Sequence, residues 1–319
     1  MKFRLLKTIL IMSMFCGPAA AQQLPDSIFN TKINAFGNTL QDVPPDIIEV
    51  STSPEQPAAG EKVWVRAILR TDPDMTPFLV NRAKIYFATD GQNYAAVDMQ
   101  LVDEKQSLWQ ASLPGFPAGT RVDFALAAWD EVGNAVFQVP LQTKVSRDGL
   151  FPVIFDENDT DIPDGLDILQ MNYGTDGSTL FYCQQLQSAF QTFTLLGASA
   201  DAMGIFREDV RFFRHRSFTE NNDMYLAYVP AFELNGLVTI DNLIKDIPPE
   251  NPEGVIMSAK GDRVCARAPI AALSAQPARG LKVFSATVAV NPGTEDIALV
   301  DFSPYAILYF GGSSYTVAQ

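Results

Sequence analysis

The chain contains little histidine, cysteine or positive charge. Among 319 residues there are one histidine, three cysteines, and 23 lysines and arginines against 37 aspartates and glutamates, for a net charge of −14. Nucleic-acid binding proteins need a concentrated basic face, and electrostatic docking on anionic lipid needs the same. The charge balance therefore argues against both kinds of partner.

The single histidine also restricts catalysis. A Ser-His-Asp or Cys-His device would have to use His215, which stands between Arg214 and Arg216. No serine occupies a Gly-x-Ser-x-Gly elbow, and the many acidic residues single out no carboxylate pair for glycoside hydrolysis. We therefore predict that the protein is not an enzyme and that His215 is an ordinary surface residue.

Long apolar runs are missing too, apart from a short one at the N-terminus. Lys2, Arg4 and Lys7 precede or interrupt the apolar residues 5–15, and small residues follow at 19–21. This pattern predicts a signal peptide over residues 1–21, cleaved before Gln22. A lipoprotein site at Cys16 is the less favoured alternative, because Phe15 stands where a small residue is needed. We expect an exported protein, in the periplasm, on the cell surface or in the medium, with a mature net charge of −17.

Two cysteines remain after cleavage, each within a strand-like run. They are Cys183 in Thr-Leu-Phe-Tyr-Cys and Cys265 in Arg-Val-Cys-Ala-Arg. An even number of cysteines in an oxidising compartment predicts a disulfide between them. Two separate buried thiols are the alternative, since unpaired cysteine is a common core residue.

Residues 45–146 show the two-residue period of β-strands. Residues 22–44 lack sustained periodicity and are interpreted as an N-terminal arm or linker. Alternation then begins, for example at Val63, Val65, Ala67 and Leu69, with turn residues between the runs. About seven strands in 100 residues predict a β-sandwich.

Short motifs in this interval resemble the immunoglobulin-like or fibronectin-III-like modules of secreted bacterial proteins. The residues that carry the resemblance are Ser53-Pro54, Ala59-Gly60-Glu61, Trp109-Gln110-Ala111, Pro114-Gly115, Ala118-Gly119-Thr120 and Ala128 to Asn134. They are turn and core positions, so they imply a fold and carry no function.

A second all-β unit is predicted over residues 150–319, with the boundary at the polar segment 146–149 and independent folding of the two units. Strands are expected at 179–183, 224–230, 254–259, 263–269, 281–291 and 305–310. Met203, Phe206, Val210 and Phe213 recur at helical spacing and predict a short helical insertion within 198–216. The motifs Leu166-Asp167-Ile168, Asp176 to Phe181, Gly261 to Pro269 and Asp301 to Tyr305 make this unit similar to DOMON-like, carbohydrate-binding-module-like jelly-roll sandwiches.

An acidic loop opens the second unit. Asp156, Asn158 and Asp167, with Thr160, fall at the spacing of a calcium-binding loop. Asp161 replaces the glycine wanted at the sixth position, and Pro163 restricts the backbone. A solvated loop is favoured, with weak calcium binding as the alternative and no other cofactor expected.

Aromatic residues leave the ligand open. Trp64, Trp109 and Trp129 all lie on predicted strands, where core packing is the ordinary explanation. The sequence therefore predicts a non-catalytic exported binding or adhesion protein of the cell envelope. The second resemblance implies glycans as the ligand class. The alternatives are an accessory or substrate-positioning subunit of a separate secreted enzyme, and a structural envelope assembly protein.

Overall fold

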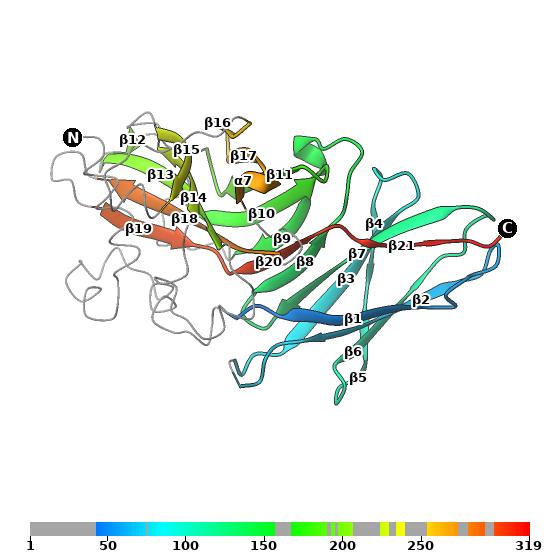
Figure 1. Cartoon of the computed structure of the whole chain (residues 1–319). Coiled ribbons are helices and arrows are strands. Elements are labelled where there is room, and N and C mark those ends of the chain that lie inside the picture. Colours follow the sequence, from blue (N-terminus) through cyan, green and yellow to red (C-terminus); the bar gives the residue numbers. More distant parts are fainter. Residues whose placement is uncertain are drawn as a thin grey trace.

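The computed structural model describes residues 43–74, 76–156, 167–189, 193–194, 197–206, 224–229, 234–239, 254–273, 280–290 and 297–319 (Figure 1). Nearly all regular structure in these ranges is β-strand, with only a 3-10 turn at Arg147–Gly149 and a four-residue helix α7 at Ile270–Leu273. The all-β, multi-sheet prediction is confirmed. The predicted signal peptide, Asn158 and His215 lie outside the described residues.

The first sheet has four antiparallel strands in the order β1-β2-β6-β5. Alternate residues of β2, from Val63 to Leu69, point inward and are at most 1% exposed, whereas Trp64, Arg66 and Arg70 point outward. This is the two-residue period expected for a sheet with one covered face. The strands are β1 (Asp46–Ser53), β2 (Val63–Arg70), β5 (Gln100–Asp103) and β6 (Leu108–Leu113).

A long sheet crosses the whole described part of the molecule. Its main path runs β15-β14-β13-β18-β20-β8-β7-β3-β4, with β12, β19 and β21 attached to its sides. Residues from both predicted units therefore belong to one sheet. The strands are β3 (Val80–Ala88), β4 (Ala95–Asp98), β7 (Arg121–Asp130), β8 (Ala135–Val139), β12 (Phe193–Thr194), β13 (Gly197–Phe206), β14 (Met224–Val229), β15 (Leu234–Thr239), β18 (Leu281–Val290), β19 (Ile297–Phe302), β20 (Ala306–Phe310) and β21 (Ser313–Thr316).

A five-stranded antiparallel sheet covers the other side of the long sheet. Its order is β16-β17-β11-β10-β9. The strands are β9 (Phe151–Phe155), β10 (Ile168–Thr175), β11 (Thr179–Leu186), β16 (Ile256–Lys260) and β17 (Arg263–Pro269). Three layers are thus stacked around the middle of the long sheet.

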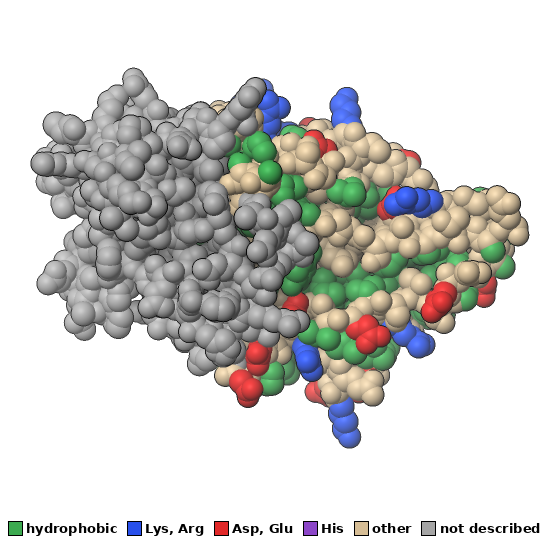
Figure 2. All heavy atoms as spheres, in the orientation of Figure 1, with side chains coloured by type: hydrophobic (Ala, Val, Ile, Leu, Met, Phe, Trp, Pro, Cys, Tyr) green, Lys and Arg blue, Asp and Glu red, His purple; other side chains and the backbone are tan. Residues whose placement is uncertain are grey.

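Strand β7 is buried on both faces because it serves two cores. Phe124 and Leu126 belong to the core against the four-stranded sheet, whereas Ala127 and Trp129 belong to the core against the five-stranded sheet. In Figure 2, hydrophobic side chains form a band between the places of β1 and β21. Partly buried residues, among them Ile47 and Tyr309, pack on the first core. The two sandwiches therefore share one layer.

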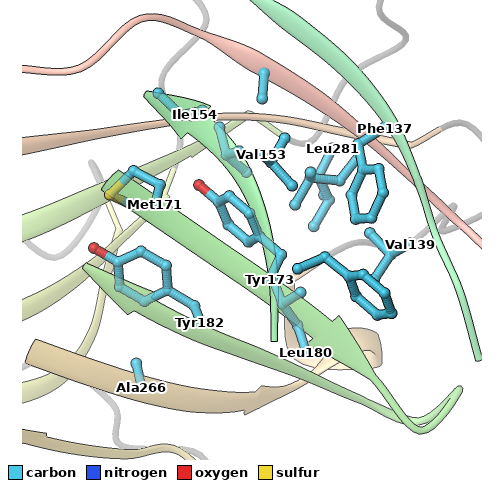
Figure 3. Packing of buried hydrophobic residues seen from close by; sticks show 14 of the residues in the cluster. Phe137, Val139, Val153, Ile154, Met171, Tyr173, Leu180, Tyr182, Ala266 and Leu281 are labelled. Atoms are coloured by element: carbon cyan, nitrogen blue, oxygen red, sulfur yellow. The ribbon is translucent and has the colours of Figure 1, made fainter. Parts of the chain in front are cut away.

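The second core is rich in aromatic side chains. Figure 3 shows Tyr173 of β10 and Tyr182 of β11 among aliphatic residues, near Phe137 and Val139 of β8. The ring centroids of Phe137 and Phe151 are 5.8 Å apart. Edge-to-face and tilted ring contacts of this kind add to the stability gained by burying apolar area.

The C-terminal strands return to the first sandwich. Strand β20 pairs parallel with β8, and β21 pairs antiparallel with β7 (Figure 1). Between them, a side chain on Gly312 would overlap the Phe124 carbonyl oxygen, so glycine allows the chain to pass from one partner strand to the next. Residues 45–146 therefore do not contain every strand of the sheet to which they contribute, because β20 and β21 come from the C-terminal end of the chain. Independent folding of the two units stays a prediction.

The helical prediction is wrong over residues 198–206, which form part of β13. This strand pairs along its length with β18 on one side, and on the other side residues 201–205 pair with β14 and residues 197–198 with β12. Alanines at 198, 200 and 202 have a period of two, but the wider spacing of Met203 and Phe206 suggested a helix. Backbone pairing on both edges decides the conformation here. The remainder of the predicted helix lies outside the described residues.

Candidate functional site

The predicted disulfide is present between Cys183 and Cys265. The two residues lie directly opposite each other on β11 and β17, with their Cα atoms 4.1 Å apart. Both are nearly buried, at 4% and 9% exposure. Inward residues of the same strands, such as Tyr182 and Val264, belong to the second core. The period of two therefore places the disulfide on the outer face of the five-stranded sheet.

Three rows of outward side chains cross β16, β17 and β11 around the disulfide. Strand register sets each row, because directly opposite residues of antiparallel strands share a face. The rows are Ile256, Arg267 and Phe181; Ser258, Cys265 and Cys183; and Lys260, Arg263 and Gln185. The outer face thus combines apolar side chains with three cations.

The segment that joins the two predicted units forms a wall beside these rows. It packs on Gly174 of β10, where a Cβ atom would overlap the side chains of Leu150 and Gln142. Between this segment and the first two rows lies a hollow of about 190 Å³. Its lining includes Val145, Leu150, Phe181 and Ile256, with the disulfide among them.

The charges around the hollow are positive. Arg147 and Arg267 line it, and among the residues that the structure describes no aspartate or glutamate does. Arg147 Nη2 donates to Ser258 Oγ at 3.3 Å, while exposed Arg267 has no hydrogen bond or ion pair among the described residues. Arg263, which does not line the hollow, forms an ion pair with Asp148 at 3.1 Å.

A second hollow is also lined by charged residues, and its cation forms an ion pair. It has a volume of about 340 Å³ and lies beside Tyr94, Leu141 and the turn at Asp176. Arg121, the one basic residue of its described lining, pairs with Asp123 at 2.9 Å. The Tyr94 hydroxyl donates to the Leu141 carbonyl at 3.0 Å, and burial raises the pKa of Tyr94 to about 12. Asp176 Oδ1 accepts from the N–H groups of Ser178 and Thr179, and the buried Gln142 Oε1 has no hydrogen-bond partner among the described residues. The single cation is therefore paired, and this hollow offers no free positive charge to an anion.

The four-stranded sheet carries the exposed tryptophan of the chain. Trp109 and Trp129 are buried, as expected, but the core prediction is wrong for Trp64, which is 43% exposed. Its neighbours across the strands are Ser53 on β1 and Ser112 on β6. One row further, Arg66 Nε donates to Gln110 Oε1 at 2.8 Å. Alternation with Val63 and Val65, which are buried, was the sequence signal that Trp64 faces outward.

The predicted calcium residues lie at the two ends of the acidic loop. Asp156 N–H donates to the Leu169 carbonyl at 3.0 Å, and the Asp167 carbonyl accepts from Gln187 N–H at 2.9 Å. Asp167 is 1% exposed. Asn158 is outside the described residues, and within the described ranges no three acidic, histidine or cysteine side chains gather as a metal site would require. Calcium binding stays a prediction.

Sequence reasoning did not identify the hollow. The alternation of Arg263, Cys265 and Arg267 puts two cations and the disulfide on one face, which is readable from the sequence. The opposite wall, at Val145 and Leu150, comes from a segment interpreted only as a boundary.

In the part of the chain that the structure describes, no helix is long and apolar enough to cross a membrane.

Comparisons with known proteins find only distant likenesses. No family model matches the chain, and no curated protein matches it. A marsupial T cell receptor structure covers 80% of this chain and 94% of its own, with 6% identity and a TM-score of 0.21. The Yersinia pseudotuberculosis adhesin InvE matches with 10% identity, a TM-score of 0.18, and coverage of 82% of this chain and 58% of its own.

A DUF4785 family protein from Legionella pneumophila has 7% identity and a TM-score of 0.19, and covers 80% of this chain and 54% of its own. This chain thus spans little more than half of the adhesin and of the Legionella protein. At such scores, a ligand has to be inferred from the residues of this chain alone.

Proposed function

We propose that the protein is an exported, non-catalytic binding protein of the cell envelope that holds a glycan on the outer face of the four-stranded sheet. Exposure of Trp64 on a sheet face is the observation that carries this proposal. A large aromatic ring fixed on a strand offers a flat apolar surface at little cost in conformational entropy. The apolar face of a sugar ring matches such a surface.

Polar neighbours suit the hydroxyl groups of a sugar. Ser53 and Ser112 flank Trp64, and the Arg66–Gln110 pair lies in the adjacent row. Serine hydroxyls, the guanidinium and the amide supply both donors and acceptors. An apolar platform with a few polar groups that fix orientation is the usual composition of a small-ligand site.

Export and the lack of catalysis are part of the same proposal. The disulfide fits an oxidising compartment, in agreement with the predicted signal peptide. The glycan class rests on the exposed ring of Trp64 with its polar neighbours, because the resemblance to DOMON-like modules concerns residues 150–319 and not this sheet. The non-catalytic assignment rests on the single histidine and on the missing serine elbow.

A glycan array probed with the mature protein tests the proposal. We expect binding to a restricted set of glycans and its loss in Trp64→Ala. Ile48→Ala is the matched control, since Ile48 is 47% exposed on β1 of the same sheet. Equal loss in both variants, or no glycan bound at all, would contradict the proposal. Co-purification from the native envelope with an enzyme would then favour an accessory subunit, and with structural proteins an assembly role.

A further inference from the structure

We propose that the hollow beside the Cys183–Cys265 disulfide is a second binding site, for a carboxylate carried on a small apolar group such as a single aromatic ring or a short alkyl chain. This site lies on the five-stranded sheet, whereas the proposed glycan face lies on the four-stranded sheet. The two proposals therefore rest on different residues and can fail separately.

The size and the walls of the hollow set the apolar part of the ligand. Phe181, Ile256, Leu150 and the disulfide offer apolar surface. The volume of about 190 Å³ is below the roughly 300–1,000 Å³ of pockets that enclose drug-sized molecules. It equals the liquid volume of about six waters, at roughly 30 Å³ each. One ring or a short chain fills this volume, and the rest of a larger molecule would have to lie outside the hollow.

The two arginines set the charge of the ligand. Arg267 lies in one row between Ile256 and Phe181, exposed and without an ion partner in the described ranges. Arg147 lines the same hollow from the connecting segment and is held by Ser258. Guanidinium groups bind carboxylates through paired, charge-assisted hydrogen bonds. The chain has a net charge of −14, yet the described lining of this hollow contains two cations and no acidic residue. The hollow therefore favours an anion.

Two molecules can supply this chemistry. One is a free carboxylic acid, and the other is the C-terminal carboxylate of a peptide that ends in a hydrophobic residue. Both place a carboxylate next to one apolar group, and the size of the hollow admits only that end of a peptide. The experiment separates them with two probes, 3-phenylpropionate and N-acetyl-glycyl-phenylalanine.

Calorimetric titration of the mature protein with both probes tests the site. We expect at least one probe to bind, and 3-phenylpropanol, which lacks the charge, to bind at least about tenfold more weakly than 3-phenylpropionate. Arg267→Gln should weaken binding by about tenfold or more, because a charge-assisted bond is worth that factor. Arg263→Gln is the matched control, since Arg263 has the same charge on the same face of β17 but does not line the hollow.

Each outcome bears on the site. Tighter binding of the free acid assigns a small metabolite, and tighter binding of the peptide assigns a protein terminus. No binding of either probe to the wild-type protein overturns the proposal. If Arg263→Gln weakens binding as much as Arg267→Gln does, the proposal is also overturned, because overall positive charge would then attract the probe. An affinity for 3-phenylpropanol equal to that for 3-phenylpropionate would overturn it as well. Trp64→Ala should leave this binding unaltered, whatever its effect on glycans.

Discussion

The rings of Tyr173 and Tyr182 lie 5.7 Å apart in the second core, yet only one of the two hydroxyl groups has a hydrogen-bond partner there. Tyr182 shares a hydrogen bond of 3.0 Å with Ser285 Oγ, which connects the five-stranded sheet to the long sheet. The Tyr173 hydroxyl is buried without a partner among the described residues, and burial raises its pKa.

Replacing each tyrosine with phenylalanine should therefore have opposite effects. Tyr173→Phe removes a buried hydroxyl that has no partner, so stability should stay the same or rise by up to about 1 kcal/mol. Tyr182→Phe leaves Ser285 Oγ short of a partner and should cost about 1–2 kcal/mol. Urea denaturation of the two variants measures the difference, and an equal loss in both would contradict the assignment.

Gly312→Ala should detach the last strand. A Cβ atom at this position would overlap the Phe124 carbonyl oxygen, so β21 has to move away from β7. We expect a loss of about 1–3 kcal/mol, typical of a backbone clash at a packed position. Ser314→Ala, an exposed change in the same strand, is the control and should alter stability by less than about 0.5 kcal/mol.

The same strand bears on the folding of the separate units. A fragment that ends near Arg147 lacks β20 and β21, and leaves Phe137 and Trp129 uncovered on the second face of the long sheet. A fragment of residues 22–147 should unfold cooperatively, as independent folding requires, but with a lower midpoint than the full chain. A cooperative transition at the midpoint of the full chain would show that the second core adds nothing to the first.

Removal of the disulfide should lower stability substantially. The two cysteines are 82 residues apart in sequence, and the chain-entropy model gives roughly 4.5 kcal/mol as an upper value for such a loop. Denaturation of Cys183→Ala/Cys265→Ala beside the wild-type protein measures the loss. Mass spectrometry of unreduced peptides checks the bond itself, and free thiols in exported protein would contradict it.

Asp130 should make stability depend on pH. Burial raises its pKa to about 6, against hydrogen bonds from the Asn134 side chain and from the Val132 and Asn134 N–H groups that favour the charged form. The native state then holds a proton that the unfolded state has released, so the free energy of unfolding falls as pH rises from about 4 to about 6.

The aspartate-to-asparagine variant isolates this effect. Between pH 4 and pH 7 the free energy of unfolding of the wild-type protein should fall by about 2–3 kcal/mol more than that of Asp130→Asn. This difference is the free energy that corresponds to the raised pKa. Denaturation curves at a series of pH values measure this loss. Parallel pH profiles for the two proteins would contradict the raised pKa.

Calcium should shift the thermal midpoint little or not at all. Asp156 and Asp167 close the ends of the acidic loop, but Asp161 and Pro163 depart from the calcium-loop pattern. A bound ion would stabilise the native state by mass action, so melting with calcium and with a chelator reports it. A shift of many degrees at micromolar calcium would reverse this prediction.

Alternation by itself predicted an all-β chain, and the cysteine count predicted the Cys183–Cys265 bond with two separate buried thiols as the alternative. A period of two follows from strand geometry, and the predicted loss of Cys16 with a signal peptide leaves one possible intrachain pair. The two-residue period also placed Trp64 on the face opposite to Val63 and Val65, although it could not show which of the two faces would be buried.

Only the tertiary structure decided which faces meet and which strands are shared. The pairing of β20 with β8 and of β21 with β7 joins residues more than 150 positions apart, and no local pattern encodes such a partner. Residues 198–206, which were expected to be helical, form a strand because their backbone pairs with neighbouring strands on both sides. The hollow beside the disulfide exists because Gly174 lets the connecting segment lie against the sheet. Each of these features depends on contacts between distant segments, which form only when the whole chain is folded.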